Sequence, residues 1–118
     1  RPTPAPSFAI TFAGELVWKT NSSGNGNGSN RCSQLTVHAS GAFTTNGAGG
    51  VVSYEWVRVD NTGNRIVISE APIRIAAGDR SWHSVVSDSF TPAHSGSEQL
   101  VFLSPTYPVA AQSWSCLG

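Results

Sequence analysis

Turn-forming residues divide this chain into short segments, and this spacing is the feature that most constrains its fold. Clusters of Gly, Asn, Ser, Asp and Pro recur roughly every 8 to 14 residues, which is typical of a chain of short strands. Between the clusters, apolar residues alternate with polar ones. The clearest case is residues 51–60, where Val52, Tyr54 and Trp56 share one face. No segment shows a helical period, so the sequence predicts an all-β protein.

The number of such segments favours an immunoglobulin-like two-sheet β-sandwich with seven or eight antiparallel strands. A closed barrel is the alternative. At 118 residues the chain is long enough for one core and too short for two. A Trp in the middle of a central strand fills the space between two sheets, so Trp56 is expected in this core. The full set of residues assigned to the core is Tyr54, Trp56, Val86, Phe90 and Trp114.

Two segments differ in composition from the rest. Residues 1–7 are Pro-rich and are expected to be the end of a linker. Residues 20–30 consist mostly of Gly, Asn and Ser, which bury little apolar area, so we expect a flexible loop. Residues 8–118 then form a single domain, expected to be an excised segment of a longer protein.

The first predicted strand covers residues 8–19. Ile10, Phe12, Leu16 and Trp18 all fall on the same parity, and Gly14 interrupts the apolar run. A glycine inside a strand often marks a bulge or bend. The sequence therefore predicts one strand with a kink or bulge at Gly14.

The two cysteines, Cys32 and Cys116, allow either one disulfide or two free thiols. No Cys-x-x-Cys pair or Cys/His cluster is present, so the sequence predicts no metal site and no cofactor. The low content of charged residues, 12%, suits an exported protein, and this favours the disulfide. A disulfide would indicate an oxidising compartment, either extracellular or at the cell surface.

The charge balance limits the possible partners. Lys plus Arg and Asp plus Glu are both 7, so the formal net charge is zero. Nucleic acid and acidic membranes attract basic proteins, so neither is expected as a partner. No apolar run approaches the roughly 20 residues of a membrane span, so this segment is not expected to insert into a membrane.

Sequence motifs for catalysis are missing. There is no Gly-x-Ser-x-Gly elbow, and the four glutamates are scattered over different predicted strands. The turn at residues 60–64 offers oxygen ligands but lacks the spacing of a calcium loop. We therefore expect that the domain is not an enzyme.

The four tryptophans are the most informative residues for binding. If all of them are buried, they complete the core and leave no aromatic surface. If one or two are exposed on one face, they can form a flat platform on which sugars stack. In that case Trp18 and Trp82 are the candidates for the platform.

Residues 32–61, CSQLTVHASGAFTTNGAGGVVSYEWVRVDN, resemble bacterial surface modules with an immunoglobulin-like or fibronectin type III-like sandwich. The segments LVFLSP at 100–105 and WSC at 114–116 match the last strands of such modules. These modules occur outside the membrane in actinobacterial proteins, and some lie on the outer side of membrane Ser/Thr kinases. The resemblance covers residues 32–116 and implies an extracellular, non-catalytic sensor, ligand-binding or spacer module.

The partner of such a module is expected to be a protein, a peptide or a cell-wall glycan. The alternative is a carbohydrate-binding accessory domain of a secreted enzyme. An exposed aromatic platform would favour this second interpretation.

Overall fold

The computed structural model describes residues 7–21 and 30–117. Most of the predicted linker end at 1–7 and of the predicted loop at 20–30 lies outside these residues. Thr20 and Asn21 are described, and both belong to the first strand rather than to a loop. The elements are β1 (Ile10–Asn21), a 3-10 turn η1 (Cys32–Gln34), β2 (Leu35–Thr45), β3 (Gly50–Asp60), β4 (Arg65–Ser69), β5 (Ile73–Ile75), β6 (His83–Ser84), β7 (Asp88–Phe90), β8 (Gly96–Ser104) and β9 (Gln112–Trp114).

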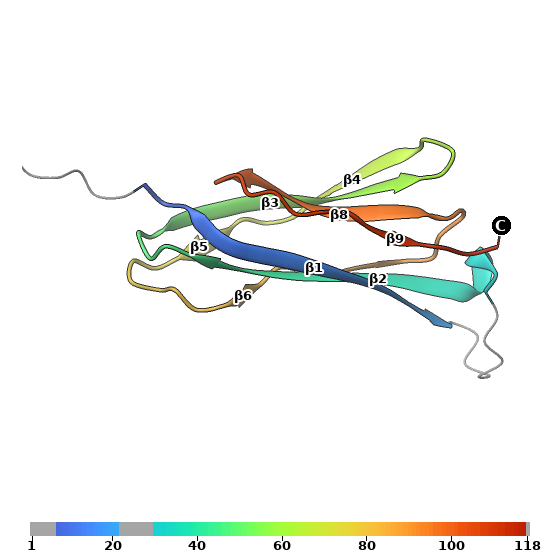
Figure 1. Ribbon diagram of the computed structural model, residues 1–118, viewed down its shortest axis with the longest axis horizontal. Coiled ribbons are helices and arrows are strands. Elements are labelled where there is room, and N and C mark those ends of the chain that lie inside the picture. The colour runs from blue at the N-terminus through green and yellow to red at the C-terminus, as the bar shows by residue number, and fades with distance from the viewer. Residues whose placement is uncertain (1–6, 22–29, 118) are drawn as a thin grey trace, which may run out of the picture.

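The strands form two antiparallel sheets, which confirms the predicted all-β sandwich (Figure 1). One sheet has the order β1-β2-β6, with β7 also pairing with β2. The other has the order β4-β3-β8-β9, with β5 also pairing with β3. The described part of the chain has nine strands, more than the predicted seven or eight, because the segment 80–90 is divided into β6 and β7. Among the described residues, no helix is long and apolar enough to cross a membrane.

The long central strand β3 supplies the middle of the core, as its alternation predicts. Val52, Tyr54 and Trp56 are buried between the sheets. Their polar atoms are satisfied there, because Trp56 Nε1 donates to the carbonyl of Val86 at 2.8 Å and the Tyr54 hydroxyl accepts from the Val86 amide at 2.8 Å. Trp114 on β9 is also buried.

The assignment of Val86 to the core is wrong. Its side chain is 53% exposed, and its neighbour Val85 is buried instead. The cause is a break in the predicted strand, since β6 ends at Ser84 and β7 begins at Asp88. Between them the backbone of Val86 turns toward Tyr54 and Trp56, so its side chain points outward.

Phe90 is only partly buried. Its ring packs edge-on against Trp114, with the two centroids 5.2 Å apart. The guanidinium of Arg58 lies 3.8 Å from the centroid of the same ring. Phe90 therefore lies at the edge of the core rather than inside it.

The predicted kink or bulge at Gly14 is also wrong. The β1–β2 register is continuous from Phe12 to Asn21 and shifts by one residue between Ile10 and Phe12. Thr11 is therefore the extra residue of a bulge, which reverses the side-chain alternation of the strand from that point on. Ile10 is buried, whereas Phe12 and the apolar residues that follow on its parity point away from the core.

Cys32 and Cys116 form a disulfide, so the alternative of two free thiols is excluded. The bond joins η1 to the end of the chain across 84 residues. Backbone bonds reinforce the junction, since the Cys32 amide donates to the carbonyl of Leu117 at 2.9 Å. The Cys116 amide donates to Ser95 Oγ at 2.9 Å. The first turn after residue 30 is thus tied to the last strand.

Candidate functional site

Strand β1 carries its large apolar side chains on the outer face of its sheet. Phe12 is 64% exposed, Leu16 is 59% exposed and Trp18 is 44% exposed. Trp82, which immediately precedes β6, is 63% exposed. The outer surface around these four side chains is called the aromatic face below.

Small side chains separate the large ones on this face. Across the strands Gly14 is opposite Ala42, Leu16 is opposite Ser40, and Ala42 is opposite Ser84. These residues and Trp82 line one open hollow. A Cβ atom added at Gly14 would meet no atom within 4 Å, so the glycine leaves space open to solvent rather than fitting tightly against a neighbour.

A second hollow adjoins the first and shares Trp82 with it. Its walls are Thr11, Phe12 and Thr44, with Arg80 at one side. The hydroxyl oxygens of Thr11 and Thr44 lie 2.8 Å apart and are hydrogen-bonded. The bulge at Thr11 thus places a pair of hydroxyl groups beside two aromatic rings.

Trp18 lies on the same face but lines neither hollow. Its ring stacks on His38 of β2, with the centroids 5.2 Å apart and the planes 16° from parallel. His38 is itself held by hydrogen bonds to Thr20 Oγ1 at 2.7 Å and Ser89 Oγ at 3.0 Å. The structure therefore brings Trp82 together with Phe12 and Leu16, which the sequence reading did not single out, and places Trp18 beyond Leu16 along β1.

The inner face of β1 carries an acidic side chain. Glu15 is buried, and its Oε1 accepts a hydrogen bond from the Leu100 amide of the opposite sheet at 2.8 Å. Burial raises the pKa of Glu15 to about 7, although the bond from Leu100 opposes the rise. The register of β1 thus buries a carboxyl group while exposing Phe12, Leu16 and Trp18.

A second buried group of charges lies between the sheets. Arg58 donates two hydrogen bonds to the carboxylate of Asp88, both at 2.8 Å. Glu98 is completely buried, and its Oε2 lies 3.9 Å from Nε of Arg58. Burial raises the pKa of Glu98, and the neighbouring Asp88 adds to the rise. Burial is the largest single influence on the pKa of Asp88 and acts to raise it, but the hydrogen bonds and charge of Arg58, together with Glu98 and the Ser89 amide, outweigh it and lower that pKa.

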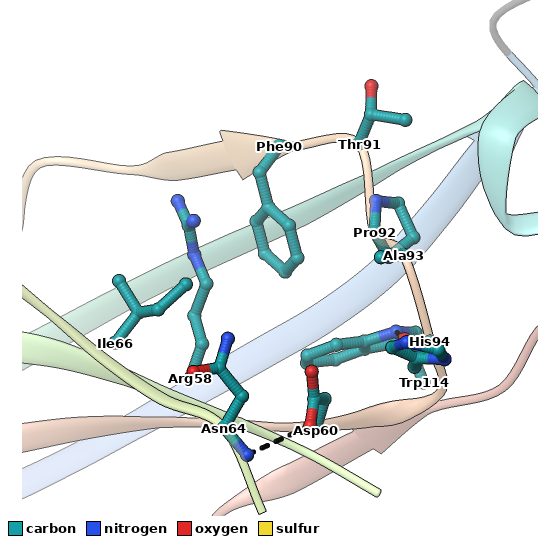
Figure 2. Close-up of a pocket in the computed structure, with 10 residues that line it drawn as sticks. All are labelled: Arg58, Asp60, Asn64, Ile66, Phe90, Thr91, Pro92, Ala93, His94 and Trp114. Atoms are coloured by element: carbon teal, nitrogen blue, oxygen red, sulfur yellow. Dashed lines mark hydrogen bonds between the residues drawn. The ribbon is translucent and has the colours of Figure 1, made fainter. Parts of the chain in front are cut away.

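A separate pocket of about 170 Å³ opens at one end of the sandwich (Figure 2). Ile66 of β4 forms one wall, and Phe90, Pro92 and Trp114 face it across the opening. The polar residues at its rim are Arg58, Asp60, Asn64, Thr91 and His94.

Within residues 7–21 and 30–117, no group of three or more His, Cys, Asp or Glu could hold a metal ion. Comparisons with protein families, with curated proteins and with solved structures found no match to this chain. The case for a function therefore depends on the surfaces described above.

Proposed function

We propose that this domain is a non-catalytic extracellular binding module that holds a glycan chain on its aromatic face. The observation that carries the proposal is the reversed alternation of β1. Burying a Phe or Leu side chain stabilises a protein by about 1.5–3 kcal/mol. Burying a carboxyl group is unfavourable unless it stays neutral or is well paired. The register of β1 leaves Phe12 and Leu16 exposed and buries Glu15, so the fold loses the stabilisation from burying the apolar side chains and incurs the cost of burying a carboxyl group. Such an arrangement is expected where the exposed residues serve binding.

The chemistry of the aromatic face suits a sugar ligand. Aromatic rings stack on the C–H faces of sugar rings, and hydroxyl groups bond to sugar hydroxyls. The hollows combine Phe12 and Trp82 with the hydroxyl groups of Thr11, Ser40 and Ser84. The carboxyl group of Glu15 borders one hollow but is directed inward to Leu100. Among the described residues lining the two hollows, Arg80 is then the one charged group on the outside, which suits a ligand of low charge.

The length of the face also suits a chain-like ligand. Phe12 and Trp18 are six residues apart on one strand, which corresponds to about 20 Å. Gly14 and Ala42 form the floor between them, so an extended ligand can lie flat along β1. A ligand in this position contacts Trp82 first and reaches Trp18 only if it is long enough.

The buried carboxyl groups support a non-catalytic role. Glycosidases use two carboxyl groups on either side of an accessible bond. Here Glu98 is completely buried and Asp88 is engaged by Arg58, so neither can reach a sugar in solvent.

The disulfide suits an oxidising compartment. Together with the resemblance to bacterial immunoglobulin-like surface modules, it supports placement at the cell surface or in a secreted protein. The same face could bind cell-wall glycan in the ectodomain of a receptor kinase, or bind a glycan in an accessory domain of a secreted enzyme.

The test is a binding screen with soluble glycans and peptidoglycan fragments. We expect at least one glycan chain to bind and Trp82→Ala to weaken that binding at least tenfold with the melting temperature unchanged. Val67→Ala is the matched control, because it removes an exposed apolar side chain from the other sheet. Failure of every glycan to bind, or equal binding by Trp82→Ala and the parent, would refute the proposal.

A further inference from the structure

We propose that the free edge of β4 binds an extended peptide segment of a partner protein, which adds a strand beside β4 and places one apolar side chain in the pocket next to Ile66. This site lies on the other sheet from the aromatic face and does not depend on glycan binding.

The first observation is an open row of backbone hydrogen-bonding groups. β4 is the end strand of its sheet, paired with β3 on one side only. The amide of Asp60 donates to the carbonyl of Asn64, so these two residues form a hydrogen-bonded pair. Along an antiparallel ladder, hydrogen-bonded pairs alternate with pairs that are not hydrogen-bonded. The register then assigns Ile66 and Ile68 to bonding with β3. The N–H and C=O groups of Arg65, Val67 and Ser69 therefore point to the free edge.

The edge is accessible and only lightly protected. Proteins blunt exposed edges with proline, charged side chains, bulges or a covering segment. β4 contains no proline, its one charged residue is Arg65 at the end next to the turn, its register with β3 is regular, and Val67 is 41% exposed. Figure 1 shows the turn between β3 and β4 standing away from the other strands. An extended backbone is the partner that can satisfy such an edge.

The second observation is the pocket beside this edge. Ile66 lies on the parity that faces the opposite sheet, because it is opposite Arg58, yet its side chain is 44% exposed. The pocket begins at Ile66 and continues to Phe90 and Trp114 (Figure 2). In an added strand, the residue opposite Ile66 points the same way, with Cβ atoms about 5 Å apart. Its side chain therefore enters the pocket, whose volume of about 170 Å³ suits one medium-sized apolar side chain.

A carboxylate at the rim of the pocket favours a positively charged residue in the peptide. Hydrogen bonds from Thr62 hold the pKa of Asp60 below its ordinary value, so the carboxylate is ionised. The bonds from Thr62 and Asn64 all end on Oδ1 of Asp60, which leaves Oδ2 able to accept another. The charge of Arg58 is already engaged by Asp88. Because side chains alternate faces along a strand, we expect a lysine or arginine two positions from the apolar residue of the peptide, opposite Asn64 and beside Asp60.

A phage-displayed library of random nine-residue peptides, selected on the full chain, provides the probe. Selected peptides should share one apolar residue with a basic residue two positions away. Val67→Pro removes a donor from the free edge without touching the β3 ladder, and it should weaken binding of a selected synthetic peptide at least tenfold. Val67→Thr keeps the donor and should bind like the parent.

Two further measurements make the test independent of any effect of proline on folding. The amides of Val67 and Ser69 should exchange with solvent more slowly when the peptide is bound. Ile66→Phe, which narrows the pocket while keeping the edge, should also weaken binding. Selection of no peptide, or peptides whose binding is lost in Trp82→Ala but kept in Val67→Pro, would overturn the proposal. Self-association of the chain that Val67→Pro abolishes would also overturn it, because the occupant would then be a second copy.

Discussion

Replacing Glu15 with glutamine should stabilise the domain at alkaline pH while leaving it nearly unchanged at acid pH. Glutamine has the shape of the protonated carboxyl group, and its side-chain oxygen can still accept the bond from the Leu100 amide. The substitution therefore keeps the contact between the sheets and removes only the possibility of ionisation.

The magnitude follows from the pKa of Glu15, which is raised from 4.5 to about 7. Between these two values the folded state keeps the proton and the unfolded state loses it, so the free energy of unfolding falls as the pH rises. Each pH unit in this interval costs up to about 1.4 kcal/mol. Because Glu15 borders an open hollow, solvent reduces the effect, and we expect about 1–3 kcal/mol in total. The contribution of the neutral Glu15 to the free energy of unfolding is fully present below pH 4.5 and is lost as the pH rises to about 7.

Urea unfolding at about pH 5 and at about pH 8 measures this difference. The parent should be clearly less stable at the higher pH, and part of that loss should persist in Glu15→Gln because the pKa of Glu98 is raised as well. Glu55→Gln is the control, because Glu55 lies on the parity of β3 that points away from the core. The free energy of unfolding of this variant should depend on pH in the same way as that of the parent. If Glu15→Gln has the same pH dependence as the parent, or is less stable at about pH 8, Glu15 is not buried as described.

Two further substitutions test the core and the disulfide. Trp56→Ala should lower the free energy of unfolding by about 3–5 kcal/mol, because it empties a fully buried site, whereas Trp18→Ala should change it by about 0.5 kcal/mol or less. A loss below about 1 kcal/mol for Trp56→Ala in chemical denaturation would contradict the packing of β3. Replacing both Cys32 and Cys116 with alanine should cost about 4 kcal/mol on the chain-entropy estimate for so long a loop, and a melting temperature equal to that of the parent would contradict this.

The sequence predicted the parts of the fold in which local pattern and burial agree. The alternation around Tyr54 and Trp56 identified the central strand and its inner face, because a residue in a regular strand follows a strict period of two. Whether any tryptophan is exposed was left open by the sequence, but Trp18 and Trp82, named as the candidates for an exposed platform, are the two that the structure exposes. The disulfide was favoured over two free thiols by composition, and the structure confirms it.

The parts that could not be predicted depend on irregularities with no local signature. The bulge at Thr11 reverses the faces of β1, and threonine gives no sign of it, whereas Gly14 suggested a bend that does not occur. The break in the predicted strand after Ser84 turns the side chain of Val86 outward, and this break also has no local signature in the sequence. The sequence placed Phe12 and Leu16 only on one parity with Ile10 and Trp18, and their exposure on the aromatic face emerged only from the three-dimensional register.

The proposed sugar platform is tested most directly by following the four indole N–H signals in an NMR titration with the tightest-binding glycan from the screen. Trp82 and Trp18 are exposed on the aromatic face, whereas Trp56 and Trp114 are buried with their indole N–H groups bonded to backbone carbonyls. We predict that the signal of Trp82 shifts most, that Trp18 shifts with longer chains, and that Trp56 and Trp114 stay in place. Shifts confined to Trp114 or Trp56, with Trp82 unaffected, would contradict the assignment of glycan binding to this face.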